Sequence, residues 1–484
     1  MRSELLDRFR HLVDAGPDRP AVISLTTGEV TTRAALADMA ASFARAFASL
    51  RLPPHAPIVT AVGNRPEHIA ALVACLESER PLLPADPGTG TSAALALART
   101  WGAAAVVAPS ASGVPPATHA LTADLCLWQL PPSARRFNAA MMKLTSGSTG
   151  TPKAVLTSAA NLEADVDHIV RAMDIRPGDT QIGYIPLSHA YGLGNLVLPV
   201  LWQGTVAAIR EAFTPQLLPQ DVAATGARTM PAVPFMFDKL LEVLPEGAFP
   251  SRLELLISAG APLSYDSLAG FHRRFGRKIH SFYGTSETGG ISYDAGDTLS
   301  GEVTVGRPMP GVTVTLQDVE GLPASEGRRI HVAGGAVSRG YATPDGSTLD
   351  GFDAGGFLTG DLGRLDADGN LVLTGRLSSF VNVAGRKVQP EEVARRLRDM
   401  PDLADAYVLG VPCPLRGERL VAVVVPRGAA PSALRLRQFC AAALPAYKVP
   451  RDFVVVPAMP RDVRGKVDRQ RLHEIAAGSV MIDD

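Results

Sequence analysis

The chain has 484 residues, of which 47 are Lys or Arg and 48 are Asp or Glu, so its formal net charge is −1. A nearly neutral chain lacks the basic surface that nucleic acids or an anionic membrane would require. A hydrophobic content of 46% with 20% charged residues is typical of a globular protein and excludes a disordered one. At roughly 150 residues per domain, this length predicts about three structural units.

Four cysteines, at positions 75, 126, 413 and 440, are too few and too widely spaced for a disulfide framework or a zinc site. The N-terminal segment mixes charges of both signs and lacks the apolar run of a signal peptide. The most apolar stretch, 193–209, contains Asn195, Pro199 and Gln203, so it predicts a buried core segment and not a membrane span. We therefore expect a cytoplasmic protein, and the Ala-, Arg-, Gly- and Pro-rich composition suggests a GC-rich bacterium as its source.

Apolar runs at 57–62 and 103–107 predict buried strands. Between them, apolar residues recur at helical spacing: Ile69, Leu72, Val73 and Leu76. A further helix is predicted after Ser158, and its apolar face consists of Leu162, Val166, Ile169 and Met173. Asn161 and Asp165 on the same helix are expected to be solvated. Strands that alternate with amphipathic helices predict parallel sheets covered on both faces.

Glycine and proline become frequent from about residue 301, where short alternating strands are predicted at 312–316, 329–332 and 370–374. These strands indicate a small antiparallel, barrel-like subdomain. Beyond residue 380, a compact α+β unit is predicted from helices at 390–400 and 431–444 and strands at 406–411 and 420–425.

The predicted fold is therefore α/β with two domains. Residues 1–375 form a large N-terminal domain of parallel sheets covered by helices, which includes the β-rich subdomain at about 301–375. Residues 376–379 form a hinge, and residues 380–484 form a small α+β lid domain.

Two segments imitate motifs of other enzyme classes. Gly88-Thr-Gly90-Thr-Ser-Ala93 is similar to a dinucleotide-binding fingerprint, but no acidic residue occurs between Asp86 and Asp124. That fingerprint requires an acidic residue about 20 positions later, so we interpret the segment as a loop. Residues 284–288 are similar to a nucleophile elbow but have Thr288 where glycine is required, which argues against a serine hydrolase.

The segment Leu144-Thr-Ser-Gly-Ser-Thr-Gly-Thr-Pro-Lys-Ala154 combines hydroxyl groups, two glycines and Lys153. Glycines let the backbone approach a ligand closely, and backbone N–H groups and hydroxyls can bind phosphate oxygens. Lys153 adds a positive charge. The segment is not a Walker loop, because Pro152 stands where that motif requires glycine. It therefore predicts a phosphate-binding loop of another kind, with a Ser/Gly-rich surface loop as the alternative.

Thr145 to Lys153 resembles the phosphate loop of the adenylate-forming superfamily, which includes acyl- and aryl-CoA synthetases, adenylation domains of nonribosomal peptide synthetases and luciferases. Other motifs of this superfamily follow in order over nearly the whole chain: Pro186-Leu-Ser-His-Ala-Tyr-Gly192, Ser258-Ala-Gly-Ala-Pro-Leu263, Tyr283-Gly-Thr-Ser-Glu287, Thr359-Gly-Asp361, Gly375-Arg376 and Gly465-Lys-Val-Asp-Arg469. The resemblance implies that the protein activates a carboxylic acid with ATP as an acyl adenylate.

Specific roles follow from the resemblance. Glu287 is expected to hold Mg²⁺, which favours one or two carboxylates together with phosphate oxygens. Asp361 is expected to accept the ribose hydroxyls, and Arg376 to bond the ribose or a phosphate. Lys466 is expected to bridge the substrate carboxylate and the phosphate during catalysis. Thr145 and His189 are also expected to be catalytic residues. The alternatives are a surface carboxylate at 287, a turn residue at 361, a hinge salt bridge at 376 and a solvated lysine at 466.

The residues expected to bind ATP or the acceptor thiol are Thr145, Ser146, Gly147, Ser148, Thr149, Gly150, Lys153, Gly260, Ala261, Pro262, Tyr283, Gly284, Thr285, Ser286, Asp361, Arg376, Gly385 and Lys466. Gly385 belongs to a segment that matches the thiol-tunnel loop of the superfamily, where Arg386 and Lys387 are either phosphate contacts of the thiol cofactor or solvated cations. One departure is Ser378, where the superfamily usually has Asp or Lys beside the hinge.

The predicted acyl pocket comprises His189, Tyr191, Gly192, Gly284, Gly289 and Gly290. His189 is expected to gate this pocket, with a core or loop histidine as the alternative. Residues 184–194 contain no acidic side chain for a buried ammonium group, which argues against an α-amino acid substrate. Gly284 stands where acetate-selective relatives have tryptophan, so we expect room for a medium-chain or aryl acid and an apolar lining from Leu193 and Ile291.

The sequence thus predicts an AMP-forming ligase that joins a carboxylic acid to the thiol of CoA. One alternative is an acyl-AMP ligase that loads the phosphopantetheine of a separate carrier protein. A second alternative is a catalytically inactive nucleotide-binding homologue, against which Lys153, Glu287, Asp361 and Lys466 argue. The expected partners are small molecules or a carrier protein, and neither nucleic acid nor a membrane.

Overall fold

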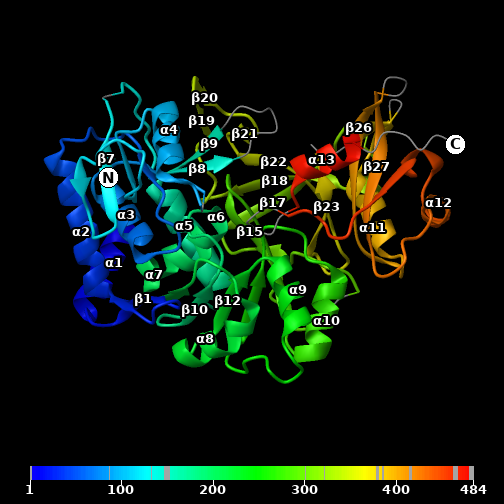
Figure 1. Cartoon of the computed structure of the whole chain (residues 1–484), viewed down its shortest axis with the longest axis horizontal. Coiled ribbons are helices and arrows are strands. Elements are labelled where there is room, and N and C mark those ends of the chain that lie inside the picture. Colours follow the sequence, from blue (N-terminus) through cyan, green and yellow to red (C-terminus); the bar gives the residue numbers. More distant parts are fainter. Residues whose placement is uncertain are drawn as a thin grey trace. The chain divides into compact units, whose positions relative to one another are not determined.

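The computed structural model describes residues 3–86, 88–131, 133–145, 153–299, 301–320, 322–377, 381–383, 386–413, 417–461 and 467–478. Contacts divide the chain into two units (Figure 1). The first is Met1–Val314 with Val332–Leu358, and the second is Thr315–His331 with Thr359–Asp484. The predicted hinge at 376–379 stays a prediction, because Ser378 and Ser379 lie outside the described residues.

One nine-stranded sheet of the first unit has the order β16-β15-β14-β13-β12-β10-β11-β1-β2. The strands from β14 to β1 in this order are parallel, and β2, β15 and β16 add antiparallel edges. The bounds are β1 Pro20–Ser24, β2 Val30–Thr32, β10 Thr180–Gly183, β11 Val206–Ile209, β12 Thr229–Ala232, β13 Leu255–Ser258, β14 Ile279–Thr285, β15 Gly289–Tyr293 and β16 Arg307–Pro308.

A second nine-stranded sheet has the order β20-β19-β9-β8-β4-β3-β5-β7-β6. Its central strands β8, β4, β3 and β5 are parallel, and the others pair antiparallel. The bounds are β3 Ile58–Thr60, β4 Leu82–Pro84, β5 Ala105–Pro109, β6 His119–Ala120, β7 Leu125–Gln129, β8 Met141–Thr145, β9 Lys153–Thr157, β19 Tyr341–Thr343 and β20 Gly346–Thr348.

Helices cover both sheets, so strands such as β11 and β13 are buried at every position. The predicted helix after Ser158 is α5 (Ala159–Ala172), which begins with a capping box between Ser158 and Asn161. The stretch 193–209 is buried core, as predicted. The other helices are α1 Glu4–Ala15, α2 Arg33–Ser49, α3 Pro66–Glu77, α4 Thr91–Trp101, α6 Ala190–Gly192, η1 Leu193–Val197, α7 Leu198–Gln203, η2 Pro215–Leu217, α8 Leu218–Thr225, α9 Pro234–Val243 and α10 Tyr265–Phe275.

A five-stranded sheet carries the boundary between the units, because β17, β18 and β22 contribute residues to both. Its order is β17-β18-β22-β21, with β23 paired to β22. Its bounds are β17 Val312–Gln317, β18 Arg328–Gly334, β21 Phe352–Asp353, β22 Gly356–Leu365 and β23 Leu371–Arg376, and the short helix η3 (Ala324–Glu326) lies between β17 and β18. The three strands predicted after residue 301 are thus present as β17, β18 and β23, and β23 pairs antiparallel with β22.

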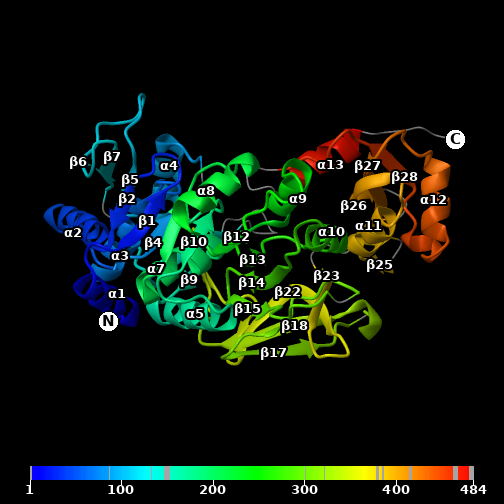
Figure 2. The same ribbon diagram turned by 90° about the horizontal axis from the view of Figure 1, so that it is seen from below.

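The C-terminal part of the second unit is the predicted α+β fold, built on a sheet of order β25-β24-β27-β26 with β28 parallel to β27 (Figure 2). One hydrophobic cluster joins this sheet to α11 and α12, and another joins it to α13. The bounds are β24 Val381–Val383, β25 Arg386–Val388, α11 Pro390–Arg398, β26 Leu403–Cys413, β27 Gly417–Pro426, α12 Ala433–Ala441, η5 Ala446–Lys448, β28 Asp452–Val455 and α13 Arg469–Gly478.

Two local predictions need correction. Asn161 and Asp165 are not solvated, since they are only 8% and 7% exposed. Their polar atoms are bonded to distant parts of the chain, which periodicity within one helix does not reveal. The loop predicted from Gly88 ends early, because α4 begins at Thr91.

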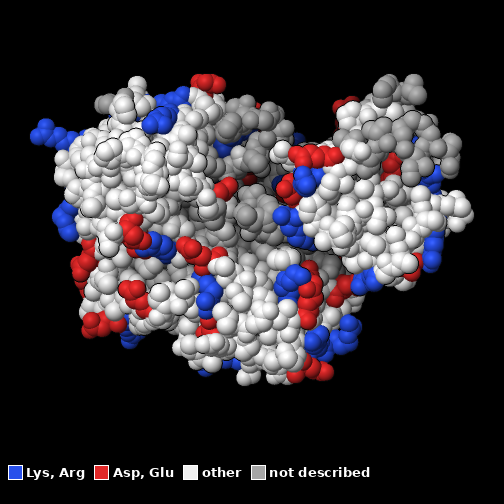
Figure 3. All heavy atoms as spheres, viewed as in Figure 1, with Lys and Arg blue, Asp and Glu red and all other residues white. Residues whose placement is uncertain are grey.

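The surface agrees with the near-neutral charge. On the face drawn in Figure 3, acidic and basic side chains are interspersed over the described surface. Within the part of the chain that the structure describes, no helix has both the length and the apolar character needed to span a membrane.

Candidate active site

Four neighbouring parallel strands of the first sheet, β10, β12, β13 and β14, direct their carboxyl ends to one edge. Ligands of open α/β sheets bind at such an edge. Three sequence motifs follow directly from these strands: 184–192 after β10, 259–263 after β13, and the end of β14 at Tyr283–Thr285. The topology therefore brings the predicted acyl, adenine and Tyr-Gly-Thr-Ser-Glu segments together.

The predicted adenine loop is open to solvent. Gly260, Ala261 and Pro262 are exposed, and Gly260 has a φ of +83°, which favours glycine. Tyr283 is 6% exposed, whereas the following Gly284 is exposed. An exposed backbone beside a buried aromatic side chain is suited to a planar ligand.

The two ends of the predicted phosphate loop are paired. Thr145 ends β8 and Lys153 begins β9, and these residues are partners in the antiparallel register. The Thr145 hydroxyl donates to the Lys153 carbonyl at 3.3 Å. The intervening Ser146, Gly147, Ser148, Thr149 and Gly150 lie outside the described residues. The Lys153 ammonium forms an ion pair of 2.8 Å with Asp350, whose side chain is 68% exposed.

Glu287 is held by a segment distant in sequence. The phenol of Tyr341 donates to Glu287 Oε1 at 2.6 Å, and the backbone N–H of Ser338 donates to the Glu287 carbonyl at 2.8 Å. Thr285 and Thr288 hydroxyls lie 3.0 Å apart and stabilise the turn that carries Glu287. Glu287 is therefore an anchored carboxylate and not a freely moving surface residue.

Behind this turn, Lys143 and Asp165 are buried charged residues, 6% and 7% exposed. Burial lowers the pKa of Lys143 against the opposing attraction of Asp165 and Glu287. Burial raises the pKa of Asp165, while the backbone N–H of Gly290, 2.8 Å from Oδ1, and the charge of Lys143 lower it. Lys143 therefore interacts electrostatically with both Asp165 and Glu287, while its burial opposes the charged form of its amine.

In the second unit, Asp361 lies in β22 opposite Arg376 of β23. It is strand-bound, so the turn alternative is wrong. Arg376 Nε forms an ion pair with Asp361 Oδ1, and the Asp361 N–H donates to the Thr359 hydroxyl at 3.1 Å. Asp361 is 8% exposed, whereas the Arg376 side chain is 54% exposed. The motif residues Thr359, Asp361 and Arg376 thus form one polar cluster.

We expect Asp361→Ala to weaken ATP binding by at least about tenfold, since a hydrogen bond to a charged group contributes about 1.5–3 kcal/mol. Calorimetric titration with ATP measures this effect. Asp368→Ala, on the exposed turn between β22 and β23, is the matched control and should bind ATP normally. Unchanged binding by the Asp361 variant would refute the ribose assignment.

The predicted acyl-pocket residues after β10 are close together. His189 precedes α6 and its Nε2 lies 3.5 Å from Asp86 Oδ1, an ion pair when the imidazole is protonated. The Tyr191 hydroxyl donates to the Ile257 carbonyl at 2.9 Å, and burial raises the pKa of Tyr191. A Cβ at Gly192 would lie 2.0 Å from the Pro186 carbonyl oxygen. Gly192 is therefore required by close backbone packing.

The space around the other pocket glycines differs from the expectation. A Cβ at Gly284 would lie 2.7 Å from the carbonyl oxygen of Gly289, and one at Gly289 would lie 2.3 Å from Asp165 Oδ1. Leu193 and Ile291 are 1% and 0% exposed, so neither lines open space. The absence of a side chain therefore leaves room for the Gly289 backbone at position 284 and for the Asp165 carboxylate at position 289, and does not create an open volume.

This packing predicts that Gly284→Ala destabilises the protein by about 1–3 kcal/mol, because even one methyl group forces β14 away from the Gly289 carbonyl. Urea denaturation measures the change. Gly301→Ala is the control, since a Cβ there would meet no atom within 4 Å. If both variants were equally stable, the close approach would not be the reason for glycine at 284.

Several predicted residues are not placed. Lys466 and Gly385 lie outside the described residues, as does Ser378, and the side chains of Arg386 and Lys387 are not described. Within the described residues no group of three His, Cys, Asp or Glu side chains is arranged as a metal site. A single carboxylate at 287 still fits Mg²⁺, which takes its remaining ligands from phosphates and water.

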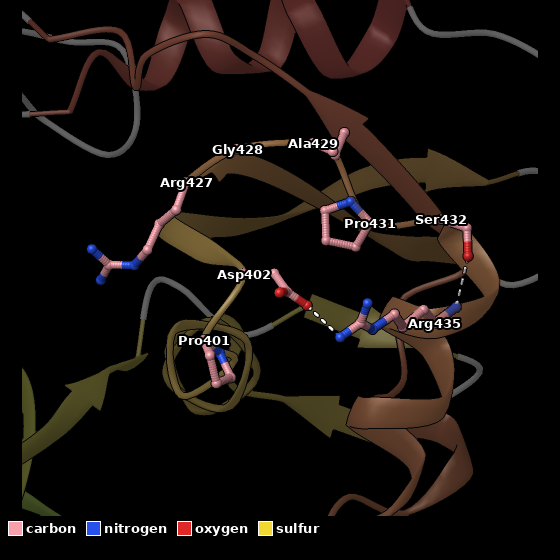
Figure 4. A pocket seen from close by; sticks show the side chains of 9 residues that line it. Pro401, Asp402, Arg427, Gly428, Ala429, Pro431, Ser432 and Arg435 are labelled. Carbon is pink, nitrogen blue, oxygen red and sulfur yellow. Dashed lines mark hydrogen bonds and ion pairs between the residues drawn. The ribbon is translucent and has the colours of Figure 1, made fainter.

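An open pocket of about 570 Å³ lies elsewhere, between the end of α11 and the start of α12 (Figure 4). Asp402 and Arg435 point toward one another across it and form an ion pair of 2.7 Å. It contains none of the predicted site residues and belongs to the C-terminal fold. Its lining consists of Pro401, Asp402, Arg427, Gly428, Ala429, Ala430, Pro431, Ser432 and Arg435.

Sequence reasoning missed four residues that contact or face the candidate site: Lys143, Asp165, Tyr341 and Asp350. A charged residue inside the apolar strand 141–145 is one signal that identifies Lys143 as unusual. Asp165, Tyr341 and Asp350 contact residues that are 125, 54 and 197 positions away in the sequence, respectively, and no local pattern encodes such contacts.

The chain belongs to the family of AMP-binding enzymes, because the family model matches residues 9–342 and the model of the AMP-binding enzyme C-terminal domain matches residues 392–466. It is an AMP-forming acid–thiol ligase of the adenylate-forming superfamily. Sulfoacetate–CoA ligase of Cupriavidus necator is 32% identical over 377 residues, 76% of this chain and 72% of that protein. 2-Succinylbenzoate–CoA ligase of Geobacillus kaustophilus is 29% identical over 340 residues, 69% of each chain.

The fold agrees with solved structures. ATP-bound MatB from Rhodopseudomonas palustris has a TM-score of 0.82 over 97% of this chain and 98% of that chain, at 24% identity. The α/β fold with a small C-terminal domain is therefore confirmed. Ligases of this family use ATP and CoA to activate and transfer a carboxylic acid.

Proposed function

We propose that this chain converts a carboxylic acid and ATP into acyl-AMP and pyrophosphate, and then transfers the acyl group to the thiol of CoA. The observation that supports this most directly is the grouping of Lys153, Tyr341 and Glu287: the Tyr341 hydroxyl lies 2.6 Å from Glu287, and Lys153 Nζ lies 5.5 Å from the centre of the Tyr341 ring. A cation and an anchored carboxylate beside a phosphate loop suit phosphoryl chemistry, which depends on positioning and charge.

Each residue has a distinct role in this proposal. Lys153 attracts phosphate oxygens, and Asp361 accepts the ribose hydroxyls in place of part of its bond to Arg376. Glu287 would hold Mg²⁺, which supplies charge neutralisation to the phosphates when bound. Lys466 brings a positive charge to the reacting carboxylate and phosphate. Thr145, whose hydroxyl donates to the Lys153 carbonyl, joins the two ends of the phosphate loop.

For the substrate, we infer a medium-chain or aryl acid and not an α-amino acid. The partly buried segment 184–194 offers no carboxylate to an ammonium group. A second candidate is an acid that bears another anionic group. The names of the two relatives favour it, since sulfoacetate and 2-succinylbenzoate each carry two acidic groups.

Pyrophosphate release over a panel of acids tests the substrate class. The panel contains acetate, an α-amino acid, octanoate, benzoate, sulfoacetate and 2-succinylbenzoate. We expect kcat/KM to be highest for octanoate or benzoate. A preference for acetate or the amino acid contradicts the proposal, and a preference for sulfoacetate or 2-succinylbenzoate selects the second candidate.

The acceptor is tested separately. Purified acyl-AMP is offered with CoA or with a phosphopantetheine-bearing carrier protein, and thioester formation is followed by mass spectrometry. CoA thioester formation supports the proposal, and loading of the carrier alone selects the carrier-protein ligase. No pyrophosphate release with any acid would favour the inactive nucleotide-binding homologue.

A further inference from the structure

Tyr341 contacts both of the charged groups that the proposed function uses, Glu287 through its hydroxyl and Lys153 through its ring. It begins β19, which pairs with β9 so that Tyr341 is opposite Val155 and Ala342 opposite Ala154. Tyr341 is 8% exposed, and its ring packs edge-on against Phe352 with the two ring centres 5.2 Å apart. The ring is therefore fixed by packing, and the direction of its hydroxyl follows from that packing.

The hydroxyl is directed at Glu287. Its oxygen lies 2.6 Å from Glu287 Oε1, the length typical of a hydrogen bond from a neutral donor to a carboxylate. A phenol carries the one proton that this contact needs, so Tyr341 donates and the Glu287 carboxylate accepts. A carboxylate held at one oxygen keeps a single orientation and presents its other oxygen to a ligand.

The segment that carries Tyr341 is itself anchored. Asn161 of α5 donates to the carbonyls of Gly335 and Val337, each at 2.8 Å. Three residues before Tyr341, the Ser338 N–H bonds the Glu287 carbonyl, and the Ser338 hydroxyl lies 3.1 Å from that of Thr157. The same short segment therefore holds both the backbone and the side chain of Glu287.

Tyr341 also separates opposite charges. Lys153 Nζ lies 5.5 Å from the centre of the Tyr341 ring and is paired with Asp350 instead of Glu287. Direct pairing of Lys153 with Glu287 would neutralise the cation for phosphate and the carboxylate for a metal ion. A neutral aromatic side chain between them, with a hydroxyl on one side, preserves both charges for ligands.

We propose that Tyr341 is a positioning residue that orients Glu287 toward the metal ion of Mg·ATP and keeps Lys153 apart from it. This inference rests on the proposed function and deepens it, since it assigns a positioning role to a residue that touches neither substrate nor metal. Removal of the hydroxyl alone should therefore affect the magnesium-dependent part of nucleotide binding.

Calorimetric titration of ATP, in excess Mg²⁺ and in EDTA, tests the proposal with wild type, Tyr341→Phe, Glu287→Gln and the double variant. Tyr341→Phe keeps the ring, its packing on Phe352 and its place beside Lys153. We expect it to bind Mg·ATP at least about tenfold more weakly, equivalent to about 1.4 kcal/mol, and to bind ATP in EDTA as wild type does. In a protein that already carries Glu287→Gln, Tyr341→Phe should cause little further loss of affinity for Mg·ATP.

Tyr265→Phe, which removes an exposed phenol on α10, is the matched control and should change neither affinity. Equal weakening of Tyr341→Phe with and without Mg²⁺ would show a general structural role and overturn the proposal, as would full additivity in the double variant. If Glu287→Gln lost no magnesium-dependent affinity, the metal assignment itself would fail, and the role of Tyr341 with it. Acid-dependent pyrophosphate release by wild type reports on the proposed function independently.

Discussion

Glu287→Gln should reduce acyl-AMP formation by at least about 100-fold at saturating ATP, because a neutral amide is a poor ligand for a hard cation whose charge stabilises the transition state by several kcal/mol. The amide oxygen of glutamine can still accept the bond from Tyr341, so the fold around the turn should persist. The measurement is the rate of acid-dependent pyrophosphate release over a range of Mg²⁺ concentrations.

The control for this variant is Glu242→Gln, which loses only an exposed ion pair with Lys239 on α9. Its rate should equal that of wild type. If Glu287→Gln retained a wild-type rate and the same magnesium dependence, Glu287 would not be a metal ligand. A variant that unfolds at a lower urea concentration with unchanged magnesium dependence would show a structural role only.

Lys466→Ala should abolish acyl-AMP formation while it spares thioester formation from supplied acyl-AMP. A cation aimed at developing charge contributes about 100- to 1000-fold in rate, and the second half-reaction has no such carboxylate–phosphate charge to stabilise. Lys466 belongs to the predicted lid, which is expected to present another face to the site in the second step. The two half-reactions are measured separately, the first by pyrophosphate release and the second from purified acyl-AMP.

Lys239→Ala, an exposed lysine on α9, controls for the loss of a charge. Equal losses in both half-reactions of Lys466→Ala would indicate that the lysine is structural. A normal first half-reaction would remove it from the catalytic set.

The parts of the fold that sequence could predict are those with local periodicity. The apolar face Leu162, Val166, Ile169 and Met173 is buried in α5 as expected, and Ser158 caps the helix. The position of three motifs at the carboxyl edge of one sheet follows from the strand order, which the sequence alone does not give.

The missed features depend on residues far apart in the chain. The polarity of Asp165 predicts a solvent-exposed side chain. Its carboxylate is instead buried, and the N–H of Gly290 in β15 donates a hydrogen bond that compensates for the burial. The lack of a side chain at Gly284 predicts open space beside it, whereas the backbone of Gly289 occupies that space. Tyr341 lies outside every motif used, and its bond to Glu287 arises only because β19 pairs with β9. Neither the composition of the sequence nor the spacing of its motifs predicts such tertiary contacts.

The buried charges of Lys143 and Asp165 have a consequence for the evolution of this protein. Each of the two groups reduces the cost of burying the charged form of the other, so loss of one removes part of that compensation, whereas replacement of both by apolar residues removes the need for it. Positions 143 and 165 are therefore expected to co-vary among homologues, with intermediates that carry only one of the two charges rare. A lineage that exchanged the pair would also lose the electrostatic interaction of Lys143 with Glu287, so the two states of the pair should differ in how tightly the carboxylate binds a cation.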